Sequence, residues 1–185
     1  MSRQFAICGG QLTGKTALCH HIVSELKRLG FNAGYTQEAV RSSYLMFKGQ
    51  RSKKMHLESL LIQVSQEIVA SEHYDPLICD RSAIDYLAFA NLRFPHSEGS
   101  VFLDTVAATV TQYSRIYSKV YIMRTYGGVD AGDKIRSGEN VTPESVSDEV
   151  ARLCQNLGIN WSWVDDRFQF GERHLIVDDL LQHIS

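Results

Sequence analysis

The 185-residue chain lacks the features that mark several special classes of protein. No apolar run approaches the length of a membrane span, and the apolar segment after Arg3 is too short for a signal peptide. Proline occurs only 3 times, and no stretch rich in Pro, Gly and Ser is long enough to divide domains. We therefore expect residues 1–185 to form a single domain with no membrane partner.

Paired cysteines and a strong net charge are also missing. The 4 cysteines form no C-x-x-C pair, and Cys8 and Cys79 fall within apolar runs. This pattern favours reduced structural thiols in a cytoplasmic protein over a disulfide framework or a zinc site. Because the net charge is only -2, we expect no overall attraction to nucleic acid or to an anionic membrane.

One strong motif is present, Gly-Gly-Gln-Leu-Thr-Gly-Lys-Thr over residues 9–16. It fits G-x-x-x-x-G-K-[ST], the phosphate-binding Walker A loop, and lies between an apolar run and a helical pattern. Backbone N–H groups and the helix N-terminus should hold the phosphates of ATP. Lys15 should reach the β- and γ-phosphates, and Thr16 should bind Mg²⁺. The predicted nucleotide-binding residues are Gly9, Gly10, Gln11, Leu12, Thr13, Gly14, Lys15, Thr16 and Ala17.

Strand-type runs alternate with helical patterns along the chain. The runs cover residues 5–8, 33–36, 77–79, 120–123 and 175–177. The helical patterns cover residues 17–29, 57–71, 83–93 and 101–117, and a further helix should begin at Pro143 and end near Leu157. This alternation predicts an α/β fold in three layers, a five-stranded parallel sheet with helices on both faces.

Polar residues follow the ends of the predicted strands, where ligands gather in α/β sheets. Asp80 should hold Mg²⁺ opposite Thr16, as a Walker B carboxylate does, although it could instead be a helix N-cap. Glu38, after a strand expected beside the phosphate-loop strand, is the candidate general base for an attacking hydroxyl. It could otherwise be a solvated glutamate or an ion-pair partner of Arg41. Arg41 and Arg81 are candidates for binding substrate or phosphate, with surface salt bridges as the alternative.

Three segments together resemble a known family. They are residues 9–16, Gln37-Glu38-Ala39-Val40-Arg41 and Cys79-Asp80-Arg81-Ser82-Ala83-Ile84-Asp85. They resemble the P-loop kinase-like family of AAA-type ATP-binding proteins, which includes the ribosylnicotinamide kinase domain of bacterial NAD-synthesis regulators. Thymidylate and deoxynucleoside kinases share the plan more distantly. The resemblance covers about residues 5–157 and implies a P-loop NTPase fold of the nucleoside-monophosphate-kinase type.

Residues 126–140 contain 4 glycines and several charges, which predicts a lid over ATP rather than an ordinary exposed loop. Within them, Asp133-Lys134-Ile135-Arg136 resembles the family's Asp-Gly-x-Arg segment. Arg136 is the predicted catalytic cation for the transferring phosphoryl group, with Lys134 and Arg152 as alternatives. Gln37, where the family often has arginine, and Lys134, where it has glycine, depart from the pattern. The relatives' substrate therefore does not carry over.

The leading hypothesis is a kinase that moves the γ-phosphate of Mg-ATP to a hydroxyl of a nucleoside or nucleotide. A second hypothesis places that hydroxyl in nucleic acid, on a hydroxymethylated base such as 5-hydroxymethyluracil in DNA or at a strand end. It rests on the basic residues Lys48, Arg51, Lys53 and Lys54, of which Arg51 is also a candidate substrate contact. A third is a regulatory NTPase without a small acceptor. GTP in place of ATP, and a monomer or a homodimer, also remain open.

Neutralising Lys48, Arg51, Lys53 and Lys54 together should separate these acceptors. Affinity for ATP should not change, because the Walker A loop lies elsewhere in the chain. Affinity for an uncharged nucleoside should barely move, whereas a nucleic-acid acceptor should bind much more weakly. The slope of log affinity against log salt should then flatten by about one unit per lost phosphate contact. If the variant phosphorylates every acceptor as the parent does, these side chains form a solvated surface with no role in binding the acceptor.

Overall fold

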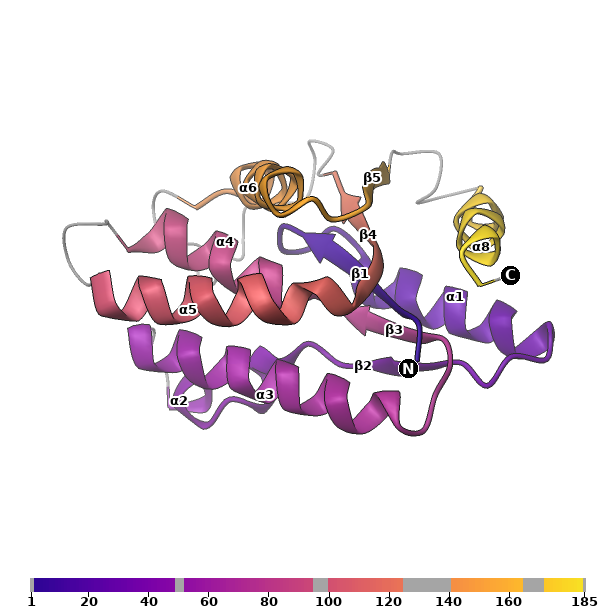
Figure 1. Ribbon diagram of the computed structural model, residues 1–185, viewed down its shortest axis with the longest axis horizontal. Coiled ribbons are helices and arrows are strands. Elements are labelled where there is room, and N and C mark those ends of the chain that lie inside the picture. Colours follow the sequence, from indigo (N-terminus) through magenta and orange to yellow (C-terminus); the bar gives the residue numbers. More distant parts are fainter. Residues whose placement is uncertain (1, 49–51, 95–99, 125–140, 165–171, 185) are drawn as a thin grey trace.

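The computed structural model describes residues 2–48, 52–94, 100–124, 141–164 and 172–184. Within these ranges, five strands form one parallel sheet in the order β2-β3-β1-β4-β5 (Figure 1). The strands are β1 (Gln4–Gly9), β2 (Gly34–Thr36), β3 (Leu77–Asp80), β4 (Tyr117–Met123) and β5 (Trp161–Val164). The predicted α/β fold with a parallel sheet is therefore confirmed.

Helices cover both faces of this sheet, as predicted. The cluster of buried residues on one face is built with α1 and α8, and the cluster on the other face with α3, α4, α5 and α6 (Figure 1). The helices are α1 (Lys15–Arg28), α2 (Tyr44–Phe47), α3 (Lys53–Ser71), α4 (Ala83–Arg93), α5 (Ser100–Tyr113), α6 (Pro143–Leu157) and α8 (Arg173–Gln182). Among the described helices, none combines the length and the apolar character that crossing a bilayer requires.

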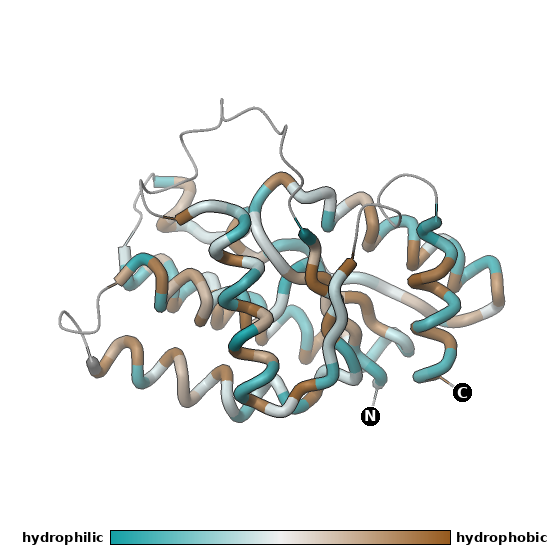
Figure 2. Tube along the Cα trace, turned by 90° about the horizontal axis from the view of Figure 1, so that it is seen from above, coloured by the Kyte–Doolittle hydropathy of each residue, from teal (hydrophilic) through white to brown (hydrophobic). Residues whose placement is uncertain are grey.

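The central strand shows why this sheet must be covered twice. Phe5 and Ile7 point into the cluster with α1 and α8, while Ala6 and Cys8 point into the opposite cluster. Successive side chains of a strand point to opposite faces, so an uninterrupted apolar run buries both. In the covering helices α1, α3 and α6, apolar and polar residues alternate along the chain, which leaves one side of these helices for solvent, whereas α4 is buried on all sides from Ala83 to Ala90 (Figure 2).

The prediction of a strand over residues 175–177 is wrong. These residues lie in α8, where Ile176, Val177 and Leu180 are buried with helical spacing in the cluster that contains α1. The fifth strand is instead β5 at the edge of the sheet, where Trp161 and Trp163 are only half-buried. A short apolar run does not distinguish a strand from a helix, and a half-exposed edge strand gives a weak apolar signal.

Two helix boundaries also differ from the predictions. Helix α3 begins at Lys53 rather than residue 57, because the Ser52 hydroxyl accepts a hydrogen bond from the N–H of Met55 and caps it. Helix α5 ends at Tyr113, and a short 3₁₀ segment, η3 (Ser114–Ile116), leads into β4. The aromatic and apolar residues at this junction continue the helical pattern, although they already belong to the next elements.

The order of the strands corrects one further expectation. The strand next to β1 on the side of Glu38 is β3, and β2 lies beyond it at the edge. Glu38 nevertheless reaches the centre of the sheet, because its carboxylate meets a side chain that follows β3. The carboxyl ends of β1, β2 and β3 therefore contribute to one site.

The loop after β1 packs tightly against α6. The N–H of Gly10 donates to the Ser147 hydroxyl at 3.0 Å, and that hydroxyl donates to the Met123 carbonyl at 2.8 Å. A Cβ atom added at Gly10 would lie only 2.3 Å from the Pro143 carbonyl oxygen, which no side chain could tolerate. Glycine at this position therefore allows α6 to fix the start of the loop.

Candidate active site

The Walker A loop joins β1 to α1 and takes a strongly curved path. Leu12 has φ of 59° and Gly14 has φ of 84°, both in the left-handed region. Gly14 is the N-cap of α1. Because glycine has no side chain, none accepts a hydrogen bond from the N–H groups of the first turn. The N–H groups of that turn, at the positive end of the helix dipole, form an anion-binding arrangement.

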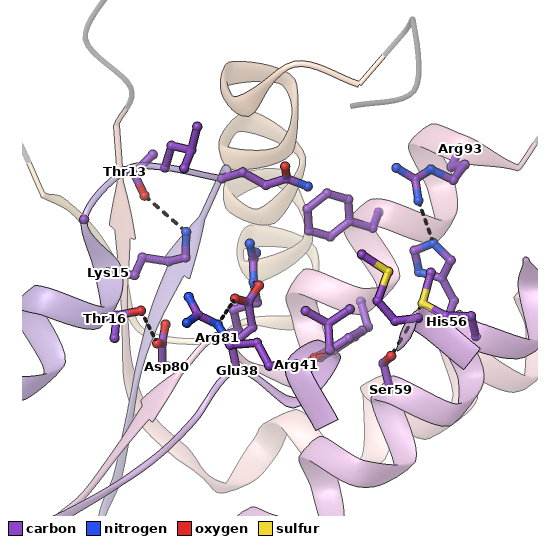
Figure 3. A pocket seen from close by; sticks show the side chains of 18 of the residues that line it. Thr13, Lys15, Thr16, Glu38, Arg41, His56, Ser59, Asp80, Arg81 and Arg93 are labelled. Carbon is purple, nitrogen blue, oxygen red and sulfur yellow. Dashed lines mark hydrogen bonds and ion pairs between the residues drawn. The ribbon is translucent and has the colours of Figure 1, made fainter. Parts of the chain in front are cut away.

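Lys15 lies in this first turn with its side chain buried inside the loop. Its ammonium group donates to the Gly10 carbonyl and to the Thr13 hydroxyl, the latter at 3.2 Å (Figure 3). Burial, together with the nearby Arg81 guanidinium, lowers the pKa of Lys15 to about 8. The ammonium group thus remains mainly charged at neutral pH. The negative charge of a phosphate in the loop would stabilise the charged form further.

Thr16 and Asp80 face each other across the loop. The Thr16 hydroxyl donates to Asp80 Oδ2 at 2.6 Å, joining α1 to the end of β3. Burial raises the pKa of Asp80, while the bond from Thr16 and the charge of Lys15 act in the opposite direction. A hydroxyl and a carboxylate are oxygen ligands of the kind that suit Mg²⁺, which needs few protein ligands when phosphates and water supply the rest. The N-cap of α4 is Ser82, not Asp80.

Glu38 is held by two arginines of unequal burial. Arg81 Nε donates to Glu38 Oε1 at 2.5 Å, and Arg41 Nε donates to Oε2 at 3.2 Å. The side chain of Arg81 is 6% exposed and that of Arg41 is 59% exposed. The pairing of Glu38 with Arg41 is therefore confirmed, and its role as general base stays a prediction. Glu38 pairs with Arg41 at the surface, and its other oxygen meets a buried guanidinium.

Arg81 is anchored on several sides at once. It has φ of 74°, an uncommon value for a residue with a Cβ atom. One guanidinium nitrogen donates to the Gly9 carbonyl at 3.0 Å and lies 3.3 Å from Asp85 Oδ1, and the guanidinium lies 5.2 Å from the centre of the Phe89 ring. A surface salt bridge, the alternative for Arg81, is excluded by this burial.

Asp85 closes an Asp-Arg-Ser-x-x-Asp pattern over residues 80–85, and no role was predicted for it from the sequence. It is fully buried and accepts a hydrogen bond from the Gly9 N–H at 3.0 Å. Its other oxygen accepts from the N–H and the hydroxyl of Ser82, which forms a capping box at the start of α4. The spacing of this pattern was the signal that could have identified Asp85 as the link between the phosphate loop and Arg81.

The charge of Glu38 depends on this arrangement. Burial alone would raise the pKa of Glu38, but the Arg81 guanidinium outweighs burial and lowers the pKa to about 2. Because the folded-state pKa is depressed, the pair stabilises the fold at pH above the unfolded value, about 4.3. This contribution is lost as the pH falls through the folded-state value.

A cavity of about 560 Å³ extends from the Walker A loop to the space between α2, α3 and α4. Figure 3 shows Lys15, Thr16 and Asp80 at one end, His56 and Arg93 at the other, and Glu38 with Arg81 between them. The lining of the far end is largely apolar. It consists of Val40, Met46, Phe47, Met55, Tyr86 and Phe89, with polar groups from His56, Ser59 and Arg93.

His56 and Arg93 were not identified from the sequence. An Arg93 guanidinium nitrogen lies 3.2 Å from His56 Nε2. Burial, with the nearby charge of Arg93, lowers the pKa of His56 to about 4, so the imidazole is neutral at physiological pH. Since arginine can only donate, Nε2 accepts and the imidazole proton resides on Nδ1. Both residues belong to helical patterns without a local motif, so only the packing of α3 against α4 brings them together.

Other predicted residues do not meet in this cavity. Lys48 and Lys53 lie over the rings of Tyr44 and Phe94, at 5.7 and 5.8 Å from the ring centres. Arg152 pairs with Glu149 on α6 at 2.6 Å. These residues, with Lys54, do not line the cavity. Arg51, Lys134, Arg136 and the lid predicted over residues 126–140 lie outside the described residues.

Replacing each arginine that contacts Glu38 should give very different results. Arg81→Met should destabilise the protein by about 3–5 kcal/mol, because Glu38 and Asp85 would lose a buried partner. Arg41→Met is the matched control and should cost less than about 1 kcal/mol, since its pair is exposed to solvent. Urea denaturation near neutral pH measures both changes. Equal, small losses for the two variants would contradict the structural role given to Arg81.

No protein-family model and no curated protein matches the chain. Solved structures do match. A NadR protein in complex with NR is similar over 99% of this chain and 50% of its own, with a TM-score of 0.78 and 13% identity. This chain also covers 49% of a second NadR structure, in complex with NAD and AMP-PNP. It therefore spans about half the length of these two proteins.

Two further similar structures are of nearly the same length as this chain. Thymidylate kinase from Ehrlichia chaffeensis matches over 98% of both chains, with a TM-score of 0.62 and 17% identity. Deoxyadenosine kinase from M. mycoides matches over 97% of this chain and 99% of its own, with a TM-score of 0.67 and 16% identity. These likenesses confirm the resemblance at the level of the fold. The chain shares the three-layer α/β fold of these four structures, a parallel sheet covered by helices on both faces.

Proposed function

We propose that the protein is a kinase that transfers the γ-phosphate of Mg-ATP to a hydroxyl group of a nucleoside or nucleotide. The observation that carries this proposal is the position of Glu38. Its carboxylate, paired with Arg81, lines the same cavity as Lys15 and Thr16 of the Walker A loop. A carboxylate beside a phosphate-binding loop is the arrangement that phosphoryl transfer to a hydroxyl requires.

On the nucleotide side, the chain supplies charge and orientation. The N–H groups at the start of α1 and the ammonium group of Lys15 would bind the phosphates. Thr16 and Asp80 would hold Mg²⁺, which when bound neutralises charge on the phosphates. These groups come from three fixed places, the loop, the helix terminus and the end of β3. The γ-phosphate would therefore be presented toward the part of the cavity that contains Glu38.

On the acceptor side, Glu38 would orient the attacking hydroxyl. Its pKa of about 2 makes it a weak base, but it remains ionised at neutral pH and can accept the hydroxyl proton as a hydrogen bond. In a loose phosphoryl-transfer transition state the hydroxyl keeps its proton until late, so position matters more than basicity. Arg81 keeps the carboxylate in place and adds positive charge close to the reacting groups.

The size and lining of the far end support a small acceptor that contains a base. Tyr86 and Phe89 offer flat apolar surfaces, and neutral His56 with Arg93 offers hydrogen-bonding groups. The similar structures are described as a nucleotide kinase, a nucleoside kinase, and a NadR protein with NR. A regulatory NTPase would need neither this part of the cavity nor Glu38, which makes that alternative weaker.

A hydroxyl within nucleic acid remains the second candidate acceptor. Phe47 lines the cavity although the residue is 86% exposed, and Lys48 follows it at the surface. An exposed aromatic ring beside a cation is suited to stacking a base of a single strand. The small acceptor is favoured because the net charge is -2 and the basic side chains of Lys48, Lys53 and Lys54 do not line the cavity.

Transfer of labelled phosphate from ATP should identify the acceptor. The screen should contain nucleosides, nucleoside monophosphates, nicotinamide riboside, and DNA with plain or hydroxymethylated bases.

Lys15→Ala should abolish nucleotide binding and transfer, because the ammonium group of Lys15 lies inside the phosphate loop. Lys27→Ala, an exposed position on the same helix, is the matched control. A folded Lys15→Ala protein with normal ATP affinity and turnover would falsify the proposed function.

Glu38→Gln should separate acceptor chemistry from nucleotide binding. The variant should keep its affinity for ATP and lose about 10² to 10⁴ in the rate of transfer, the usual range for a missing general base. Glu72→Gln, at an exposed position, controls for the loss of a carboxylate. An unchanged rate would remove Glu38 from the reaction, and a lost affinity for ATP would assign it to the nucleotide instead.

A further inference from the structure

Gln63 lies completely buried on α3, outside the residues that line the cavity. Its side-chain amide connects two loops that follow different strands. The N–H of Ala39 donates to Gln63 Oε1 at 3.2 Å, and Gln63 Nε2 donates to the Arg81 carbonyl at 3.4 Å. Ala39 is the neighbour of Glu38 in the chain. The amide thus spans the backbone segments that carry the two members of the Glu38–Arg81 ion pair.

The chemistry of the neighbours fixes which way this amide points. Ala39 presents an N–H, which requires an oxygen, whereas Arg81 presents a carbonyl and Glu67 a carboxylate, which require N–H groups. A flipped amide would place donor against donor and acceptor against acceptor. Because both N–H groups and the oxygen of Gln63 are used, one orientation of the side chain satisfies all three contacts.

Glu67 extends this network into the core. Its two oxygens accept from Gln63 Nε2 at 2.7 Å and from the Tyr117 hydroxyl at 2.8 Å. The Tyr117 oxygen in turn accepts from the N–H of Ala83 at 3.0 Å, at the start of α4. The network therefore begins at the loop after β2, passes through α3 and β4, and returns to the segment that contains Arg81.

From this geometry we infer that Gln63 is a positioning residue for phosphoryl transfer, one that holds the Glu38 and Arg81 segments in register through Ala39 N–H and the Arg81 carbonyl. This inference rests on the proposed function. Gln63 touches no part of the cavity, so its effect on the reaction would pass entirely through these two segments.

The backbone of Arg81 explains why such a brace is needed. A left-handed conformation costs about 1–2 kcal/mol for a residue with a Cβ atom, so it persists only where the surroundings fix it. The N–H of Arg81 donates to the Ile7 carbonyl at 3.0 Å, and its carbonyl accepts from Gln63. The sheet therefore fixes the N–H of Arg81, and Gln63 fixes its carbonyl.

Gln63→Met is the direct test, because methionine has a similar length and cannot form these hydrogen bonds. The Glu38 carboxyl should lose its fixed partner, and its pKa should rise from about 2 toward the ordinary value. Carbon NMR of the side-chain carboxyls measures this without any substrate. Turnover should fall by about 10- to 100-fold, as expected for misplaced reacting groups, while ATP affinity stays the same.

Gln66→Met is the matched control on the same helix. The Gln66 side-chain oxygen is buried, has no hydrogen-bond partner among the described residues, and lies away from the Glu38–Arg81 pair. This variant should leave the Glu38 titration and turnover unchanged. Gln63→Met with reduced stability but an unaltered Glu38 titration and turnover would overturn the inference, because Gln63 would then only support the core.

A double variant keeps the test valid if Gln63→Met does not fold. In Gln63→Met/Glu67→Met both members of the buried polar pair become apolar, so no Glu67 carboxyl is left in the core without the Gln63 amide. The Glu38 titration should shift as in the single variant, and an unshifted titration would again overturn the inference. If the parent protein phosphorylates no acceptor, the proposed function fails, and the carboxyl titration alone still decides the role of Gln63.

Discussion

The buried guanidinium of Arg81 is the interaction on which the rest of the site depends. It joins the carbonyl of Gly9 at the end of β1, the carboxylate of Glu38 after β2, and Asp85 at the start of α4. Without a cation at this point, the carboxylates of Glu38 and Asp85 would lose the buried positive charge that they share. A buried ion pair of this kind contributes little net stability, but removing one partner is costly. Its value to the fold therefore lies in geometry, since it aligns three strand ends around one cavity.

The residues that would act on phosphate and those that would recognise an acceptor come from different parts of the fold. Residues that would act on phosphate lie in short segments directly after strands, where the sheet fixes the backbone. His56 and Arg93, at the other end of the cavity, come from the first turn of α3 and the last turn of α4. Helix packing, rather than the sheet, sets their positions. This part of the cavity can therefore change its side chains without disturbing the Walker A loop or the Glu38–Arg81 pair.

The sequence predicted the parts of the fold and site that local patterns determine. The Walker A loop, four of the five strands and the α/β class follow from motif spacing and apolar periodicity, and Asp80 and Arg81 follow from their places after a strand. The fifth strand was misplaced because residues 175–177 are apolar enough for either element, while Trp161 and Trp163 lie half-exposed at an edge. His56, Arg93 and Gln63 could not be identified, since their partners are distant in the chain and no local motif marks them.

Gln63 shows most clearly why sequence alone falls short at this site. From its spacing on α3 it is indistinguishable from a polar residue on a solvated helix face, yet it is completely buried. A buried amide is unfavourable unless its groups are satisfied, and here the satisfying groups are two backbone atoms and a carboxylate from separate elements. The amide of Gln63 is satisfied only when all three partners are in place. The proposed catalytic pair and the core beneath it are therefore parts of one arrangement, in which contacts outside the cavity support the position that Arg81 and Arg41 give to Glu38.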